Sequence, residues 1–294
     1  MKAKLFAISS ASLALFVFLS GSPTRADNLF VSNYGNNTIV EFNSSGVGTV
    51  FASGLNGPTG LVFNSAGDLY ESDFNDNEII EFTPNGVSSV FATGLNGPEH
   101  SAFDSAGNLY VANLGGTIEK FDTNGVGTIF ASGLGGPTGL AVDGAGNVYV
   151  ANSSGGAIEE FTTNGIGSVF ANTGMATPNG LAFDSAGNLY VALAYSGTID
   201  KFTPSGAAST FANGLSVPTG LTFDSAGNLY AANAGGGIIE EFDTNGVGSV
   251  FASSGLSEPY GLAFDTIPEP STWSLLALGL ITLLLRPLLN RKRE

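Results

Sequence analysis

A thirteen-residue pattern recurs along this chain and constrains its fold more than any other feature. The copy at Gly180–Ala192 reads GLAFDSAGNLYVA, and related stretches follow one another at intervals of 39 to 41 residues. Two apolar runs flank the DSAG segment, as expected for short strands joined by a tight turn. A fixed period of this length indicates an array of similar supersecondary units. The other copies begin at Gly60, His100, Gly139, Gly220 and Gly261.

Each unit holds enough sequence for four short antiparallel strands. In one unit we expect strands at 139–143, 147–152, 157–161 and 166–171. Asn164-Gly165 separates the last two, and Asn-Gly between apolar runs is a strong hairpin signal. Four strands in roughly 40 residues are typical of a propeller blade. Because the second strand occurs six times, the sequence predicts an all-β, six-bladed β-propeller.

The repeat is cut within a unit at both of its ends. Leu29-Phe30-Val31 matches a second strand with no first strand before it, and Gly261–Asp265 matches a first strand with no second strand after it. Pairing of these segments would complete one blade and hide two strand edges. An open array would need distinct capping repeats, which we do not find. We therefore predict a ring closed by its N- and C-terminal strands.

The repeats resemble the NHL family of six-bladed propellers, in the form P-x-G-L-A-F-D-x-x-G-N-L-Y-V-A-N. Pro137–Asn152 matches this form well, and the resemblance spans about Asn28 to Asp265. The chain is also similar, more loosely, to the gluconolactonase and streptogramin-lyase groups. Gluconolactonase-like propellers hold a divalent metal on Glu, Asn and Asp ligands at one end of the channel, and the lyases use His and Glu beside magnesium. The resemblance implies at most one cofactor, a divalent cation such as Ca²⁺ or Mg²⁺.

The first 26 residues differ from the repeats and read as a signal peptide. Lys2 and Lys4 precede an apolar run from Leu5 to Leu19, and Thr24-Arg25-Ala26 offers a small-residue cleavage site. This order of basic, apolar and small residues is typical of secretory signals. The mature propeller would then comprise residues 27–265. The alternative is an N-terminal membrane anchor that is retained.

The last 28 residues, Ile267 to Glu294, resemble the PEP-CTERM sorting signal of Gram-negative bacteria. A linker, 266–270, leads to an apolar segment, 271–289, at the short limit for crossing a bilayer, and then to a basic tail, 290–294. The signal residues are Pro268, Glu269, Pro270, Arg291, Lys292 and Arg293. The resemblance implies an inner-membrane-anchored precursor that is cleaved by an exosortase, and delivery to the cell surface or extracellular matrix. A plain C-terminal membrane anchor is the alternative.

Between these ends the charge is one-sided. Residues 27–265 carry two lysines against 23 acids, a net charge of −21. Such a field repels nucleic acid and anionic lipid, so we expect no nucleic-acid partner and membrane contact only through the C-terminal segment. The chain has no cysteine, so an exported form must draw its stability from its core and from ring closure.

Residues in which one blade departs from its siblings are the best candidates for function. Glu99-His100 stands where the other blades have Thr-Gly or a related pair, and His100 is the only histidine of the chain. We predict that both face the axis near Asp73 and Asn113. A histidine beside a glutamate can act in acid–base catalysis or bind a metal. Glu99 and His100 are thus the predicted catalytic pair, and Glu99, Asp73 and Asn113 the predicted metal ligands.

Further departures fall on the face that carries the Pro-x-Gly loops. Asn179, Tyr195 and Tyr260, together with Asp73 and Asn113, are predicted to bind a ligand there, because amide and aromatic groups at a funnel mouth suit a polar ligand or peptide. Two main hypotheses remain. The first is a non-catalytic binding or scaffold module for a surface protein or polysaccharide. The second is a metal-dependent lactonase-like hydrolase or lyase. A third is a matrix protein whose acidic surface binds calcium weakly.

Overall fold

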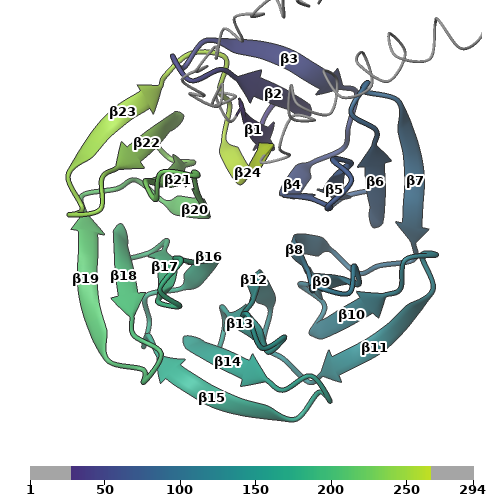
Figure 1. The fold of residues 1–294 in the computed structure, drawn as a ribbon, viewed down its shortest axis with the longest axis vertical. Coiled ribbons are helices and arrows are strands. Elements are labelled where there is room, and N and C mark those ends of the chain that lie inside the picture. Colours follow the sequence, from purple (N-terminus) through teal and green to yellow (C-terminus); the bar gives the residue numbers. More distant parts are fainter. Residues whose placement is uncertain (1–27, 266–294) are drawn as a thin grey trace, which may run out of the picture.

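Six four-stranded antiparallel sheets surround a central axis in the computed structural model, which describes residues 28–265 (Figure 1). The all-β, six-bladed prediction is confirmed. Within the described residues, no helix is both long and apolar enough to cross a membrane. The predicted signal peptide, linker, transmembrane segment and basic tail lie outside the described residues.

The four strands of a blade run from the axis outward in chain order. The innermost strands all begin at a proline: β4 (Pro58–Phe63), β8 (Pro98–Phe103), β12 (Pro137–Val142), β16 (Pro178–Phe183), β20 (Pro218–Phe223) and β24 (Pro259–Asp265). The second strands are β1 (Asn28–Asn33), β5 (Leu69–Asp73), β9 (Leu109–Asn113), β13 (Val148–Asn152), β17 (Leu189–Leu193) and β21 (Leu229–Asn233). The third strands are β2 (Thr38–Phe42), β6 (Glu78–Phe82), β10 (Thr117–Phe121), β14 (Ala157–Phe161), β18 (Thr198–Phe202) and β22 (Ile238–Phe242). The outermost strands are β3 (Gly48–Ser53), β7 (Ser88–Thr93), β11 (Gly127–Ser132), β15 (Gly167–Asn172), β19 (Ala208–Asn213) and β23 (Gly248–Ala252).

The two ends of the described chain complete one blade together. β24 pairs with β1, and this sheet has the order β24-β1-β2-β3. Val31 lies opposite Leu262, and Asn28 lies opposite Asp265. Both Val31 and Leu262 are buried in the cluster that joins this blade to the preceding one. Closure by pairing of the terminal strands is therefore confirmed.

The core lies between neighbouring blades, because side chains of one strand alternate between its two faces. Tyr190 of β17 illustrates the packing: its ring meets Phe211 of the same blade edge-on at 4.9 Å and Phe223 of the next blade at 5.0 Å. Such edge-to-face contacts between aromatic rings are favourable. Phe223 and Tyr190 thus join two neighbouring blades.

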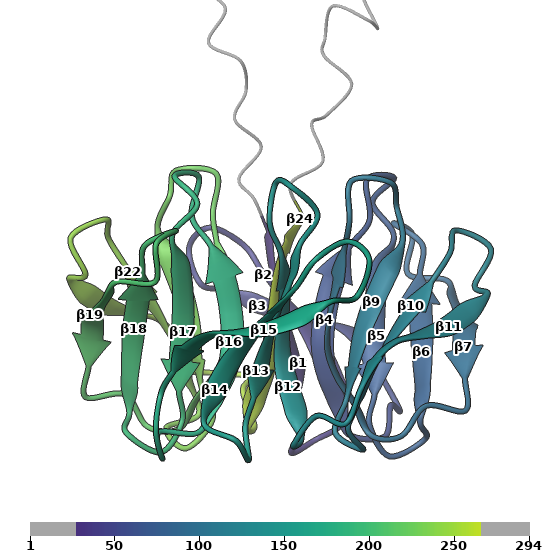
Figure 2. The ribbon, with the colours of Figure 1, turned by 90° about the horizontal axis from the view of Figure 1, so that it is seen from below.

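The strands run from one face of the ring to the other (Figure 2). We call the face on which the six innermost strands begin the Pro-x-Gly face. The opposite face carries the tight turns between first and second strands. In one of these, Asp184 Oδ1 accepts the backbone N–H groups of Ala186 and Asn188, and Gly187 takes a φ of 80°. This is the Asx-type turn expected from DSAG.

A β-bulge begins every innermost strand. In β4, Pro58 lies opposite Asp73 and Leu61 lies opposite Glu71, so Thr59 and Gly60 together face one residue of β5. The same register shift follows the proline in the other five blades. Because a bulge changes the direction of side chains locally, it allows the residue after each proline to point at the axis.

Candidate functional site

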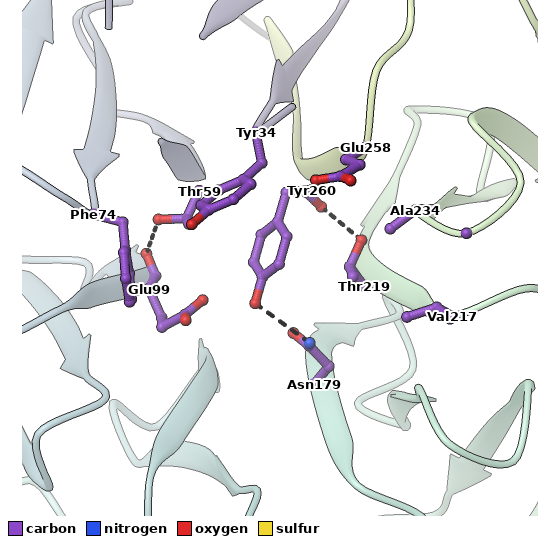
Figure 3. A pocket seen from close by; sticks show the side chains of 11 residues that line it. Tyr34, Thr59, Phe74, Glu99, Asn179, Val217, Thr219, Ala234, Glu258 and Tyr260 are labelled. Atoms are coloured by element: carbon purple, nitrogen blue, oxygen red, sulfur yellow. Dashed lines mark hydrogen bonds between the residues drawn. The ribbon is translucent and has the colours of Figure 1, made fainter. Parts of the chain in front are cut away.

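The residues that follow the six prolines form a ring around the axis on the Pro-x-Gly face. Three of them are threonine and three are not, and the two kinds alternate from blade to blade. In ring order they are Tyr260, Thr59, Glu99, Thr138, Asn179 and Thr219. Figure 3 shows five of these side chains around the cavity at the axis.

The threonines of this ring hold neighbouring blades together. Thr59 Oγ1 donates to the carbonyl oxygen of Pro98 in the next blade at 2.9 Å. Thr138 and Thr219 make the same bond to the following blade, each at 3.1 Å. All three are buried. Since a buried hydroxyl must find a partner, these residues are explained by the fold.

The three other side chains converge at the axis. Asn179 Nδ2 donates to the Tyr260 hydroxyl at 3.4 Å (Figure 3). The same hydroxyl also bonds the Glu99 side chain. Glu99 is only 6% exposed, and its Oε2 has no hydrogen-bond partner in the described structure. Burial raises the pKa of Glu99 to about 7, although the bond from Tyr260 lowers it. One carboxylate oxygen therefore remains open to a ligand.

His100 lies next to Glu99 at a position that is glycine in every other blade. Glycine is needed there because the innermost strands crowd together: a Cβ on Gly139 would overlap the carbonyl oxygen of Asn179. The imidazole of His100 stacks on the Tyr260 ring, with centroids 5.4 Å apart and planes at 30°. Burial lowers the pKa of His100 to about 4, against an opposing effect of the Thr138 backbone. Neutral His100 thus packs against the Tyr260 ring by stacking.

The cavity above these residues has a volume of about 430 Å³. Two aromatic residues from neighbouring loops form part of its wall, Tyr34 between β1 and β2 and Phe74 between β5 and β6. Their ring centroids are 6.4 Å apart. The lining consists of Tyr34, Thr59, Phe74, Glu99, Asn179, Val217, Thr219, Ala234, Gly235, Glu258 and Tyr260. Concave apolar sites with a few converging polar groups are typical ligand sites.

Other predicted site residues lie on the same face but outside this cavity lining. Asp73 Oδ2 accepts the backbone N–H of Asn56 at 2.8 Å, and Asn113 Oδ1 accepts that of Asn96 at 3.4 Å. Both side chains thus secure the Pro-x-Gly loops. Tyr195 is 82% exposed in the loop after β17. Of the predicted residues, the structure brings together Glu99, His100, Asn179 and Tyr260.

Two of the three predicted metal ligands, Asp73 and Asn113, lie outside the lining of the axial cavity and accept backbone N–H groups of the loops. Among residues 28–265, no group of three or more His, Cys, Asp or Glu side chains is arranged to hold a metal ion. Glu99 is the only carboxylate on the ring, and Asp73 is bonded to loop backbone. Calcium prefers six to eight oxygen ligands, and magnesium a near-octahedral shell. The residues present do not fit such a cofactor.

Among the cavity residues that were not predicted, Tyr34, Phe74 and Glu258 carry a signal in the comparison of blades. Tyr34 and Phe74 occupy a loop position held by Leu114, Ser153, Ala194 and Ala234 in the other blades. Glu258 stands before the proline, where three blades have glycine. Half of the acidic run 71–78 is strand, because β5 ends at Asp73 and β6 begins at Glu78.

Comparison with family models gives two matches. The model of the PEP-CTERM protein-sorting motif matches residues 266–292, and a strictosidine synthase-like N-terminal model matches residues 89–121. The predicted sorting motif is therefore confirmed. It implies an exported protein that is processed by an exosortase. Among curated proteins, none matches this chain.

Several solved structures are similar to this chain. A chain of a nidogen/laminin complex is 21% identical with a TM-score of 0.74, and covers 81% of this chain and 98% of its own. A streptogramin B lyase is 16% identical with a TM-score of 0.65, covering 80% and 91%. A gluconolactonase from Xanthomonas campestris is 16% identical with a TM-score of 0.62, covering 80% and 87%. At these identities the likeness shows the six-bladed propeller fold alone, as the resemblance of the repeats implied.

Proposed function

We propose that this protein is a non-catalytic binding or scaffold module that takes its ligand in the axial cavity. The observation that carries the proposal is the convergence of Glu99, Asn179 and Tyr260 at the floor of that cavity. Their ring neighbours are threonines that bond the backbone of the next blade. Since the fold is served by threonine at this position, the three exceptions need another explanation, and ligand binding supplies it.

The same proposal places the protein outside the cell. The sorting motif supports export. We extend this to an inner-membrane-anchored precursor in a Gram-negative bacterium, which is released to the cell surface or extracellular matrix. The acidic propeller is suited to remain soluble there. Its ligand would then be a surface protein or a matrix polysaccharide.

A variant that restores the sibling residue at each special position tests this function. Glu99→Thr, Asn179→Thr and Tyr260→Thr together make the ring uniform and leave the blade contacts in place. Wild-type protein should retain material from the exporting bacterium's surface or matrix, and the triple variant should lose that retention. Tyr195→Thr, on the same face but outside the cavity, is the control. Equal retention by the folded triple variant, or none by wild type, would contradict the proposal.

Acid–base catalysis at the same cavity is a second candidate. The pKa of Glu99, raised by burial to about 7, is matched to proton transfer near neutral pH. A metal-dependent lactonase-like hydrolase is less well supported, because only Glu99 of the three predicted metal ligands lines the cavity. A screen of lactones and cyclic esters with wild type and Glu99→Gln decides the matter. Turnover that disappears in Glu99→Gln would favour an enzyme, and no turnover would leave the binding module.

A further inference from the structure

Three aromatic rings line the axial cavity. The centroids of Tyr34 and Phe74 are 6.4 Å apart with planes at 69°, and those of Tyr34 and Tyr260 are 6.4 Å apart with planes at 41°. All three residues line the cavity (Figure 3). A cation is attracted to the face of an aromatic ring within about 6 Å of its centroid. A positive group among these rings can reach that distance from more than one of them.

Acidic groups lie at the bottom and at the mouth of the same cavity. Glu99 lines its floor, is nine-tenths buried, and has an unpartnered Oε2. Glu258 lines the mouth and is exposed. A buried carboxylate without a cation is unfavourable. Glu99 Oε2 therefore lacks a positively charged partner.

Glu258 is held at the mouth in a backbone conformation that glycine would adopt more easily. Its φ is 49°, a conformation shared by the equivalent residues Thr177 and Val217 at 53° and 52°, whereas the equivalent glycines of the other three blades have φ between 65° and 73°. An L-residue in this region costs of the order of 1 kcal/mol. The strain places a carboxylate on the cavity wall, where a glycine would leave none.

No positive side chain within residues 28–265 serves these acids. The lysines are Lys120 and Lys201, which pair with Asp104 at 3.6 Å and Asp184 at 3.4 Å in the turns of the opposite face. His100 is the remaining candidate, and burial keeps it neutral at physiological pH. The positive charge that complements the cavity must come from a ligand.

We propose that the axial cavity binds an organic ammonium cation, a methylated or alkyl-substituted amine whose head lies among the aromatic rings and above the Glu99 carboxylate. This inference rests on the proposed function, since it names the chemistry of the ligand in the same cavity. A bare metal ion suits the site poorly, because aromatic walls provide no oxygen ligands. The volume of about 430 Å³ leaves room for a chain attached to the head.

Choline and its neutral isostere 3,3-dimethylbutan-1-ol test the inference directly, because they share shape and differ in charge. Calorimetric titration of the exported protein should show choline binding at least about tenfold more tightly than the isostere, as cation–π and carboxylate contacts together require. Tetramethylammonium should compete with choline. Equal affinity for choline and the isostere, or no binding of either ammonium probe, would overturn the inference.

Variants of the cavity connect this affinity to its residues. Glu99→Gln and Phe74→Leu should each weaken choline binding at least about fivefold. Glu258→Gly should weaken binding while raising the melting temperature, because it relaxes the backbone. Glu240→Gln removes one charge outside the cavity lining and should change nothing. Choline affinity that is unchanged in folded Glu99→Gln and Phe74→Leu would also refute the inference.

The ammonium inference and the proposed function fail in different ways. If choline does not bind but retention of matrix material still requires Glu99, Asn179 and Tyr260, the ligand is of another class and the binding function stands. If retention is also independent of these residues, both proposals fall.

Discussion

Replacing Glu71 by valine should stabilise the propeller. Glu71 lies in β5 and is fully buried, and neither of its carboxylate oxygens has a hydrogen-bond partner in the described structure. The same strand position carries an aliphatic residue in every other blade: Val31, Val111, Val150, Val191 and Ala231. The substitution Glu71→Val thus restores the residue that this position holds in most of the ring.

The expected gain has two parts. Burial raises the pKa of Glu71 well above 4.5, and the nearby charges of Asp73, Glu78 and Asp76 act in the same direction. The folded protein therefore resists ionisation of a group that ionises freely when unfolded. The Glu71 carboxyl does not destabilise the wild type below pH 4.5. Above that pH its titration lowers the free energy of unfolding by about 1.4 kcal/mol per pH unit until the folded pKa is reached. Unpartnered buried oxygens cost about 1–3 kcal/mol more.

We expect Glu71→Val to raise the free energy of unfolding by about 1–3 kcal/mol at pH 4.5 and by more at pH 7. Chemical denaturation at several pH values measures both the gain and its slope. Glu71→Gln is the control that keeps the side-chain size, and it should abolish the slope. The reciprocal change Val111→Glu should introduce a similar pH-dependent loss in the neighbouring blade. A stability difference that does not vary with pH would show that the carboxyl is not forced to stay neutral, and would refute the reasoning.

Three other predictions concern closure, packing and the cavity. Leu262→Asp should destabilise the whole ring by more than about 3 kcal/mol in a single thermal transition. The control Val50→Asp, on an exposed outer strand, should change stability by under about 0.5 kcal/mol. Separate transitions for different blades would contradict this prediction. Gly139→Ala should lower the free energy of unfolding by at least about 1–3 kcal/mol in calorimetry, because a Cβ at this position has no room. Gly144 has open space around it, so Gly144→Ala should leave stability unchanged or raise it. Equal melting temperatures of the two variants would disprove the crowding. Choline affinity should rise about tenfold between pH 6 and pH 8, because the pKa of Glu99 is about 7 and only the ionised form attracts the cation; a flat titration profile would contradict this.

Much of the fold is predictable because its signals are local. The turn at Asp184 follows from an Asx acceptor and a glycine three residues later, both of which act within five residues of chain. Ring closure follows from the phase of the repeat, which leaves Leu29 and Leu262 without partners unless they share a sheet. Each of these inferences needs only strand alternation and the requirement that strand edges be covered.

The cavity is harder to predict because it depends on the β-bulge. Pro58 lies opposite Asp73. From simple strand alternation, either Asp73 or the residue after Pro58 could be expected to point at the axis. The bulge adds a residue to β4 alone, and Asp73 instead bonds the backbone of Asn56. Nothing in the letters Pro-x-Gly reveals this extra residue. The blade comparison therefore identified Glu99, Asn179 and Tyr260 but overlooked Tyr34 and Phe74, whose loop packs against the next blade's glycine.

The residue after the proline alternates around the axis between threonines, which hold the blades together, and other residues, which line the cavity. Every second blade carries a threonine whose hydroxyl bonds the next innermost strand, so Thr59, Thr138 and Thr219 connect all six blades in pairs. The strands between them need no threonine of their own, because the threonine of the preceding blade already bonds each of them. Glu99 and Tyr260 occupy two such positions, which explains how a buried acid and a large ring fit at the most crowded part of the molecule. A new functional group at the axis is therefore least destabilising at the third such position, Asn179. The variant Asn179→Asp should remain folded while it adds a second acid beside Glu99. Choline titration of this variant should then show tighter binding at pH 8, where both carboxyls are ionised.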